Sequence, residues 1–224
     1  MELRHDAIVL AGGTGRRLGG VLKPQVTVRG RRLLDHVLDA TAQARRVVVV
    51  APETVPVPDG VVRTLEDPPH GGPVAGIAAG LAALGEAAPV VLLLACDLPG
   101  AAAAVPRLLA VAGELALPGA RKSAVGTNPA VGGKSAVGTN SAVGGGSAVA
   151  GVVMRDPAGR DQWLLGVYST AALKARVAEL AAAGRLRGGS VRDLVGPLDL
   201  GTVLARPEES RDIDTWADRD AVEG

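Results

Sequence analysis

The sequence predicts an α/β fold in which a mostly parallel central sheet lies between two layers of helices. Short apolar runs of strand length alternate along the chain with segments that have helical periodicity. Glycine-rich or polar loops follow several of these runs, and hydrophobic residues make up 47% of the chain, enough for a substantial core. A length of 224 residues is typical of one α/β domain, so we expect a single domain over residues 1–224.

The first half of the chain alternates expected strands and helices. The strands are expected at residues 7–11, 46–51, 61–65 and 89–95, and the helices at 33–42, 73–84 and 101–112. The strands are continuous apolar runs, as in parallel sheets that are covered on both faces. Because ligands bind at the carboxyl ends of such strands, the loops that begin at Gly12, Glu66 and Cys96 are the expected site.

The second half begins with an unusual repeat. The heptapeptide KSAVGTN occurs at residues 122–128 and again at 134–140, within a stretch rich in Gly, Ala, Ser and Val. The repeat is too short and has too few copies for a repeat fold. We therefore interpret 121–147 as a flexible low-complexity insertion, with a lid or partner-binding loop as the alternative. After it we expect strands at 148–154, 163–168 and 200–204, and helices at 170–183 and 216–222.

Composition excludes several classes of function. The net charge is +1 and aromatic residues make up 1% of the chain, which argues against nucleic-acid partners. Cys96 is the single cysteine and the three histidines lack metal-ligand spacing, so a disulfide or zinc site is not expected. The sequence has neither an apolar run of membrane-spanning length nor a signal-peptide pattern. We therefore expect a cytoplasmic protein without a membrane partner.

The first loop, residues 10–24, has the composition of a phosphate-binding loop. It contains five glycines, two adjacent arginines and Lys23, and backbone N–H groups in such loops can wrap phosphate oxygens. Leu18 replaces the third glycine of a dinucleotide fingerprint, and Pro24 replaces the Ser/Thr of a P-loop. The alternative is a flexible turn with solvated charges. The phosphate interpretation is supported by a basic start to the chain, with seven Lys or Arg residues in 1–32, against an acidic end.

Carboxylates supply the other candidate groups. Asp97 directly follows an apolar strand, where it could hold Mg²⁺ or cap the next helix. Asp214 has the same ambiguity, because it or Thr215 could cap the last helix. Asp67 lies in a rigid Pro-rich loop and could accept hydrogen bonds from a base or ribose, whereas His70 is expected to be a loop residue.

These motifs together resemble a known family. The pattern Leu-Ala-Gly-Gly-x-Gly-x-Arg at 10–17, followed by Lys23-Pro24, resembles the signature loop of nucleotidyltransferases with a GT-A-type, Rossmann-like fold. The segments GGPVAG at 71–76, CDLP at 96–99, DQxxLxxY at 161–168 and DIDT at 212–215 resemble the MobA-like branch, the molybdenum cofactor guanylyltransferases. Leu22 stands where that family usually has Asp, and Trp163 where it often has Pro.

The resemblance implies transfer of GMP from Mg²⁺-bound GTP to the terminal phosphate of molybdopterin, with release of pyrophosphate. It implies catalytic roles for Arg17, Lys23 and Asp97, and Mg²⁺ ligation by Asp97 and Asp214. The implied nucleotide-binding residues are Leu10, Ala11, Gly12, Gly13, Thr14, Gly15, Lys23, Asp67 and Asp97, and those for the second substrate are Asp161, Gln162 and Asp212.

The resemblance also places the aromatic Trp163 and Tyr168 beside the second substrate, and it implies other molybdenum cofactor biosynthesis proteins or molybdoenzymes as partners. Two alternatives stay open. One is a cytidylyltransferase or a sugar or small-phosphate nucleotidyltransferase of the same fold. The other is a nucleotide-binding module without catalysis.

Overall fold

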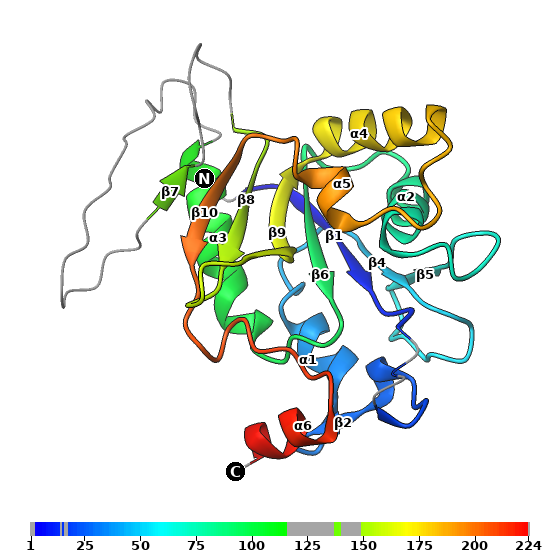
Figure 1. The fold of residues 1–224 in the computed structure, drawn as a ribbon, viewed down its shortest axis with the longest axis vertical. Helices are drawn as coiled ribbons and strands as arrows, with labels where there is room; N and C mark the ends of the chain where they lie inside the picture. The colour runs from blue at the N-terminus through cyan, green and yellow to red at the C-terminus, as the bar shows by residue number, and fades with distance from the viewer. Residues whose placement is uncertain (1–2, 14, 16–17, 116–136, 140–148, 224) are drawn as a thin grey trace.

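The computed structural model describes residues 3–13, 15, 18–115, 137–139 and 149–223. Among these residues, eight strands form one sheet in the order β5-β4-β1-β6-β9-β8-β10-β7 (Figure 1). The strands are β1 (His5–Leu10), β4 (Val47–Val50), β5 (Val62–Thr64), β6 (Val90–Ala95), β7 (Val137–Thr139), β8 (Gly151–Arg155), β9 (Asp161–Ser169) and β10 (Leu200–Leu204).

The sheet is mostly parallel, as predicted. β5, β4, β1 and β6 pair in parallel, and β8 pairs in parallel with β10. β9 runs antiparallel to both of its neighbours, β6 and β8, and β7 runs antiparallel to β10. The carboxyl ends of β1, β4, β5, β6 and β8 therefore lie at one edge of the sheet. The loops predicted to form the site follow strands that end at this edge.

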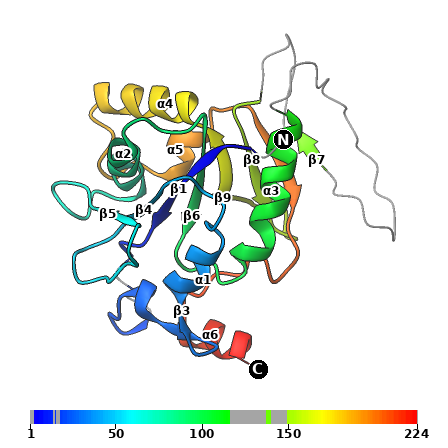
Figure 2. The ribbon, with the colours of Figure 1, turned by 180° about the vertical axis from the view of Figure 1, so that it is seen from behind.

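Helices cover both faces of the sheet (Figures 1 and 2). α1 (Leu33–Asp39) and α3 (Ala101–Leu115) pack on one face, and their buried residues share a cluster with alternate residues of β1, β6, β8 and β9. α2 (Pro73–Leu84), α4 (Thr170–Ala182) and α5 (Val191–Val195) pack on the other face. These three layers confirm the predicted fold class.

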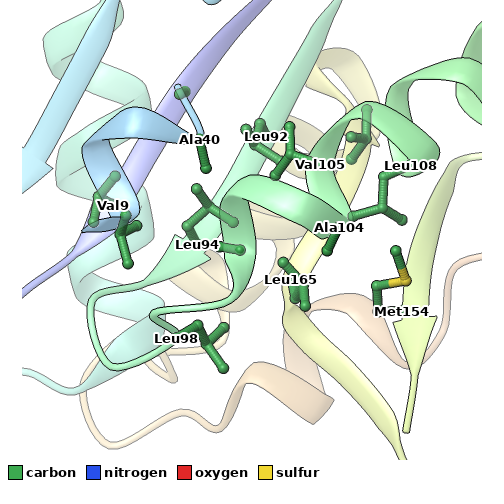
Figure 3. Packing of buried hydrophobic residues seen from close by; sticks show 14 of the residues in the cluster. Val9, Ala40, Leu92, Leu94, Leu98, Ala104, Val105, Leu108, Met154 and Leu165 are labelled. Atoms are coloured by element: carbon green, nitrogen blue, oxygen red, sulfur yellow. The ribbon is translucent and has the colours of Figure 1, made fainter. Parts of the chain in front are cut away.

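The core packs almost without aromatic side chains. Figure 3 shows the face beneath α1 and α3, where Val9, Leu92, Leu94, Leu108 and Met154 belong to one hydrophobic cluster. On the other face, Tyr168 of β9 is fully buried, and its hydroxyl donates to the Trp163 carbonyl oxygen at 2.7 Å. The expectation that Tyr168 faces the second substrate is therefore wrong: the side chain fills the core.

A third, smaller cluster lies beside the sheet. It contains Leu18, Val26, Val28, Leu33 and Ile213, with Val222 packed against it. These residues come from the end of the first loop, from the hairpin of β2 (Thr27–Val28) and β3 (Arg31–Arg32), from the start of α1, and from the last part of the chain. In both ribbon views, α6 (Trp216–Glu223) lies against this hairpin (Figures 1 and 2).

Most predicted elements occur within a few residues of their expected bounds, and some were not predicted. α5 and the β2–β3 hairpin are short, and α5 is stabilised by a capping box in which Ser190 and Asp193 exchange side-chain-to-backbone hydrogen bonds. Within the segment 121–147, residues 137–139 form β7, where no regular element was predicted. The rest of that segment lies outside the described residues. No helix among the described residues is long and apolar enough to cross a membrane.

Candidate active site

The first loop leaves β1 and turns sharply at Gly15. Gly15 has φ of +48°, and a Cβ atom there would lie 2.1 Å from the carbonyl oxygen of Val21. The Leu18 N–H donates to the Gly15 carbonyl oxygen at 2.8 Å and closes the turn. Only glycine fits this position without rearrangement. Of the remaining predicted residues of this loop, Thr14 and Arg17 lie outside the described residues.

Lys23 follows this turn at the start of a short 3-10 helix (Lys23–Gln25). Its Nζ donates to Asp97 Oδ2 at 2.8 Å and also to Asp214 Oδ1. Asp97 and Asp214 lie 74 and 191 positions after Lys23 in the sequence, yet both side chains contact its ammonium. The side chains of Lys23 and Asp97 are 15% and 20% exposed, so solvent screens their ion pair only in part.

The electrostatics of the Lys23 cluster favour the charged ammonium. Burial is the largest single influence on the Lys23 pKa and lowers it, because burial removes water from the cation. The charges and hydrogen bonds of Asp97 and Asp214 together outweigh burial, and the net effect is a raised pKa. Lys23 is therefore a permanent cation held between two carboxylates at neutral pH.

Asp97 lies just after the carboxyl end of β6, and its carboxylate contacts Lys23. α3 begins four residues later at Ala101, and the Asp97 carboxylate is turned toward Lys23. The last helix is capped by Thr215, whose Oγ1 accepts the Asp218 N–H at 3.2 Å. Asp214 is thus the residue of this pair that faces the cluster.

Asp212 lies close to the same cluster. Its residue is exposed, but the surrounding protein removes part of the hydration of the carboxylate, and this burial raises its pKa. The negative charges of Asp214 and Asp97 raise the pKa of Asp212 further. The carboxylates of Asp97, Asp212 and Asp214 therefore concentrate negative charge at this edge of the sheet.

The donor set fits one divalent cation that is shared with a ligand. Among the described residues no group of three or more His, Cys, Asp or Glu side chains could enclose a metal. Asp97 and Asp214 instead converge on a single cation, the Lys23 ammonium. Mg²⁺ is usually bound by one or two carboxylates together with phosphate and water oxygens, and this pair of side chains matches that pattern.

The predicted nucleoside-contacting residue, Asp67, is exposed in the loop after β5 and is joined to Pro68 by a cis peptide bond. The neighbouring Glu66 accepts the Gly71 N–H through Oε1 at 3.0 Å. Arg187 donates to the Pro68 carbonyl oxygen at 2.6 Å and ties this loop to the segment between α4 and α5. The loop thus lies at the same sheet edge as the first loop.

Two of the three residues predicted for the second substrate, Asp161 and Gln162, lie at the start of β9, and the third, Asp212, is in the segment before α6. The register pairs Leu94 with Leu165, which brings this end of β9 to the edge where β6 ends. Asp161 accepts from Arg155 Nε at 2.7 Å, and Gln162 donates to Asp156 Oδ2 at 3.0 Å. Both side chains therefore have partners inside the β8–β9 hairpin, and a substrate would have to share or replace them.

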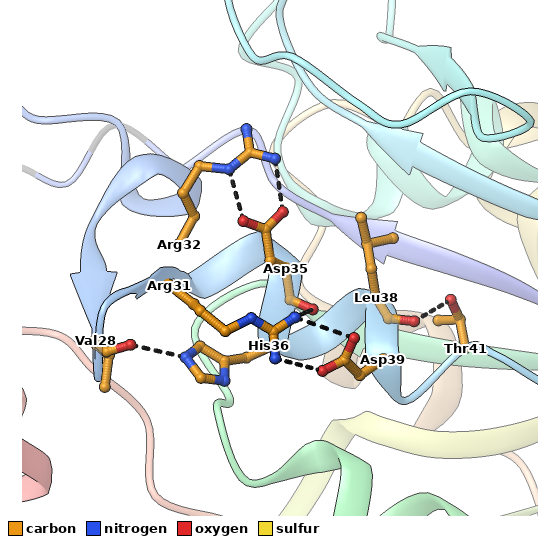
Figure 4. Close-up of polar contacts among 8 residues, drawn as sticks. All are labelled: Val28, Arg31, Arg32, Asp35, His36, Leu38, Asp39 and Thr41. Atoms are coloured by element: carbon orange, nitrogen blue, oxygen red, sulfur yellow. Dashed lines mark hydrogen bonds and ion pairs between the residues drawn. The ribbon is translucent and has the colours of Figure 1, made fainter.

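Part of the basic charge near the start of the chain is neutralised locally, as Figure 4 shows. Arg31 binds Asp39 at 2.7 Å, and Arg32 binds Asp35 at 2.6 Å. The hydrogen bond from Arg32 holds the pKa of Asp35 below its usual value. These two arginines pair along α1, so the phosphate interpretation rests on the loop and Lys23 rather than on the total basic charge.

Sequence reasoning missed one residue at the centre of the site. Ile213, between Asp212 and Asp214, is fully buried, and its N–H donates to the Asp97 carbonyl oxygen at 3.0 Å. The sequence did contain a signal for this, because an apolar residue between two acidic ones indicates a side chain that faces the interior.

Comparison with known proteins bears on the family and the fold. The model of the MobA-like NTP transferase domain matches residues 7–195. A molybdenum cofactor guanylyltransferase from Acidiphilium cryptum is 43% identical over 81 residues, which span 34% of this chain and 40% of that protein's own length.

Two solved structures share the fold. The molybdopterin-guanine dinucleotide biosynthesis protein A of Archaeoglobus fulgidus superposes with a TM-score of 0.61 at 16% identity, covering 97% of this chain and 96% of that one. The 2-C-methyl-D-erythritol 4-phosphate cytidylyltransferase of Thermus thermophilus superposes with a TM-score of 0.63 at 19% identity, covering 98% and 97%. At these identities the likeness establishes the fold alone.

Proposed function

We propose that this chain transfers GMP from GTP to the terminal phosphate of molybdopterin and releases pyrophosphate. The chain belongs to the MobA-like NTP transferase family, whose model matches residues 7–195. The observation that carries the proposal is the convergence of Lys23, Asp97 and Asp214 beside a glycine-rich turn at the carboxyl edge of the sheet. The choice of molybdopterin and GTP is supported by the partial match to a curated guanylyltransferase.

In this proposal the first loop holds the triphosphate. Backbone N–H groups of residues 12–15 would face phosphate oxygens, and Gly13 lies beside the Lys23 side chain, since a Cβ there would be in ordinary contact with Lys23 Cδ at 3.7 Å. Arg17 would add a second cation. The Lys23 ammonium gives two of its three hydrogen bonds to Asp97 and Asp214, and the third would be given to phosphate.

Asp97 and Asp214 would then hold Mg²⁺, which supplies the positive charge that offsets the charge developing on the phosphates. The acceptor phosphate oxygen attacks the α-phosphorus of GTP, a new P–O bond forms, and the bond from the α-phosphorus to the pyrophosphate breaks. The chain's part is positioning and charge neutralisation, which is the main catalytic requirement for this chemistry. Asp67 would contact the nucleoside, and Asp161, Gln162 and Asp212 would face the acceptor.

Pyrophosphate release tests this function directly. The purified chain is incubated with Mg²⁺ and either GTP or CTP, with and without molybdopterin. The proposal predicts release that requires both GTP and molybdopterin.

Faster release with CTP would replace it with the cytidylyltransferase alternative. Binding of GTP without release under any of these conditions would favour the non-catalytic module.

A further inference from the structure

The closing segment, residues 205–214, carries acidic side chains to the site but is fixed there by an apolar one. Ile213 is fully buried, whereas its neighbours Asp212 and Asp214 are exposed and half-buried. This alternation means that the Ile213 side chain points into the protein, while the carboxylates of Asp212 and Asp214 lie on the side of Lys23 and Asp97.

The first contact of Ile213 is with the loop after β6. Its N–H donates to the Asp97 carbonyl oxygen at 3.0 Å. This hydrogen bond lays the closing segment alongside the residue whose side chain receives Lys23. This hydrogen bond therefore fixes the backbone distance between Asp97 and the neighbour of Ile213, Asp214.

The second contact is with the small cluster. The Ile213 side chain packs with Leu18, Val26 and Leu33, all of which have low exposure. Leu18 closes the turn of the first loop, and the Val26 N–H donates to the Lys23 carbonyl oxygen at 3.1 Å. One side chain therefore links the closing segment to the elements that carry the phosphate-binding loop and Lys23.

Other contacts hold the closing segment on either side of Ile213. Upstream, the buried Glu209 accepts from Arg107 Nη1 at 2.5 Å. A Cβ at Gly100 would lie 2.1 Å from the Glu208 carbonyl oxygen, so the backbones touch there. Downstream, Thr215 and Asp218 cap α6. Loss of the Ile213 side chain would consequently loosen the short stretch that carries Asp212 and Asp214 rather than the whole segment.

We propose that Ile213 is a positioning residue that sets the placement of Asp214 relative to Asp97 and Lys23, and so the affinity of the site for a metal–nucleotide complex. This inference rests on the proposed function. It predicts that trimming Ile213 weakens the metal-dependent part of nucleotide binding while leaving the metal-free part in place, because the first loop keeps its own turn.

Calorimetric titration with GTP, with and without Mn²⁺, tests the role of Ile213. Ile213→Ala is expected to lower GTP affinity in Mn²⁺ by about tenfold and to change the metal-free affinity by less than about twofold. Ile213→Val, which removes one methyl group, is expected to restore most of the affinity and keeps the test open if the alanine variant folds poorly.

Val28→Ala is the matched control, because Val28 is equally buried in the same cluster but lies on β2 away from the carboxylates. It is expected to keep the wild-type effect of Mn²⁺. Equal losses of Mn²⁺-dependent affinity in the two alanine variants, or none in Ile213→Ala, would overturn the positioning role alone. A wild-type chain that binds no GTP even with Mn²⁺ would instead contradict the proposed function.

Discussion

At the scale of single residues, the site depends on the charge of Lys23. Its ammonium is shared by Asp97 and Asp214, and their charges raise its pKa despite burial. In this state the single positive charge of Lys23 reduces the repulsion between the two carboxylates. A divalent cation and the ammonium therefore compete for the same pair of side chains, and nucleotide phosphates give the ammonium its alternative partner.

This competition gives a prediction for Lys23→Met, which keeps the length of the side chain and removes its charge. Without nucleotide, Mn²⁺ is expected to raise the melting temperature of the variant more than that of the wild type, because the competing cation is gone. Affinity for GTP is expected to fall about 10- to 100-fold, the value of a charged hydrogen bond. Thermal shift and calorimetry measure the two effects.

Lys174→Met on α4 controls for the loss of one positive charge from the chain, since the exposed Lys174 donates to a carbonyl oxygen, that of Gly85, at 3.5 Å and not to a carboxylate among the described residues. An Mn²⁺ effect that is the same in wild type and both variants would show that Lys23 does not compete with metal.

Single residues were predicted well where the sequence marks the end of a strand. Asp97 follows an apolar run, so its place at the sheet edge could be read from the pattern. Its ion pair with Lys23 could not, because it depends on how the first loop folds back through Gly15. Tyr168 was misjudged because a motif position says nothing of which face of β9 is buried.

At the scale of elements, hydrophobic periodicity was enough for the long strands and helices. α2 and β10 occur at their predicted bounds, because Pro73 and the apolar run at 200–204 mark them clearly. α5 was missed because five residues are too few for a periodic signal, and β7 because its pairing with β10 is a long-range contact. The β2–β3 hairpin is likewise too short to show alternation.

The strands are tied together at the edge opposite the site by Asp6. This fully buried residue of β1 accepts from Arg45 Nε at 3.0 Å, before β4, and from the Ala88 N–H at 2.6 Å, before β6. Burial alone would raise the pKa of Asp6, but the hydrogen bonds from Arg45 and Ala88 outweigh it and lower the pKa. The ionised carboxylate therefore stabilises the folded state above the unfolded pKa of 3.8.

Asp6→Asn is expected to lower the free energy of unfolding at pH 7 by about 2 kcal/mol, since a charged hydrogen bond to Arg45 is lost. The difference from wild type is expected to shrink as the pH falls below 3.8, because the wild-type carboxylate then becomes protonated. Urea denaturation over this pH range measures both. A difference that stays constant through the acid range would mean that the charge of Asp6 contributes nothing.

At the scale of the whole molecule, the site lies where the three-layer fold meets the small hydrophobic cluster around Ile213. The sheet contributes the first loop and Asp97, and the cluster holds Lys23 and the closing segment in place. The α/β class could be predicted from sequence because it follows from strand–helix alternation. The joining of the first 33 residues to the last twelve through Ile213 and α6 could not, because it is a contact between segments far apart in the sequence.

The central claim is that this junction binds a metal–nucleotide complex, and Mg²⁺-dependent GTP binding tests it most directly. Calorimetry compares wild type, Asp97→Ala and the control Asp39→Ala, whose carboxylate pairs with Arg31 on the surface. We expect Mg²⁺ to strengthen GTP binding in wild type and in Asp39→Ala but not in Asp97→Ala, with all three proteins folded. An equal Mg²⁺ effect in Asp97→Ala, or its absence in wild type, would contradict the account.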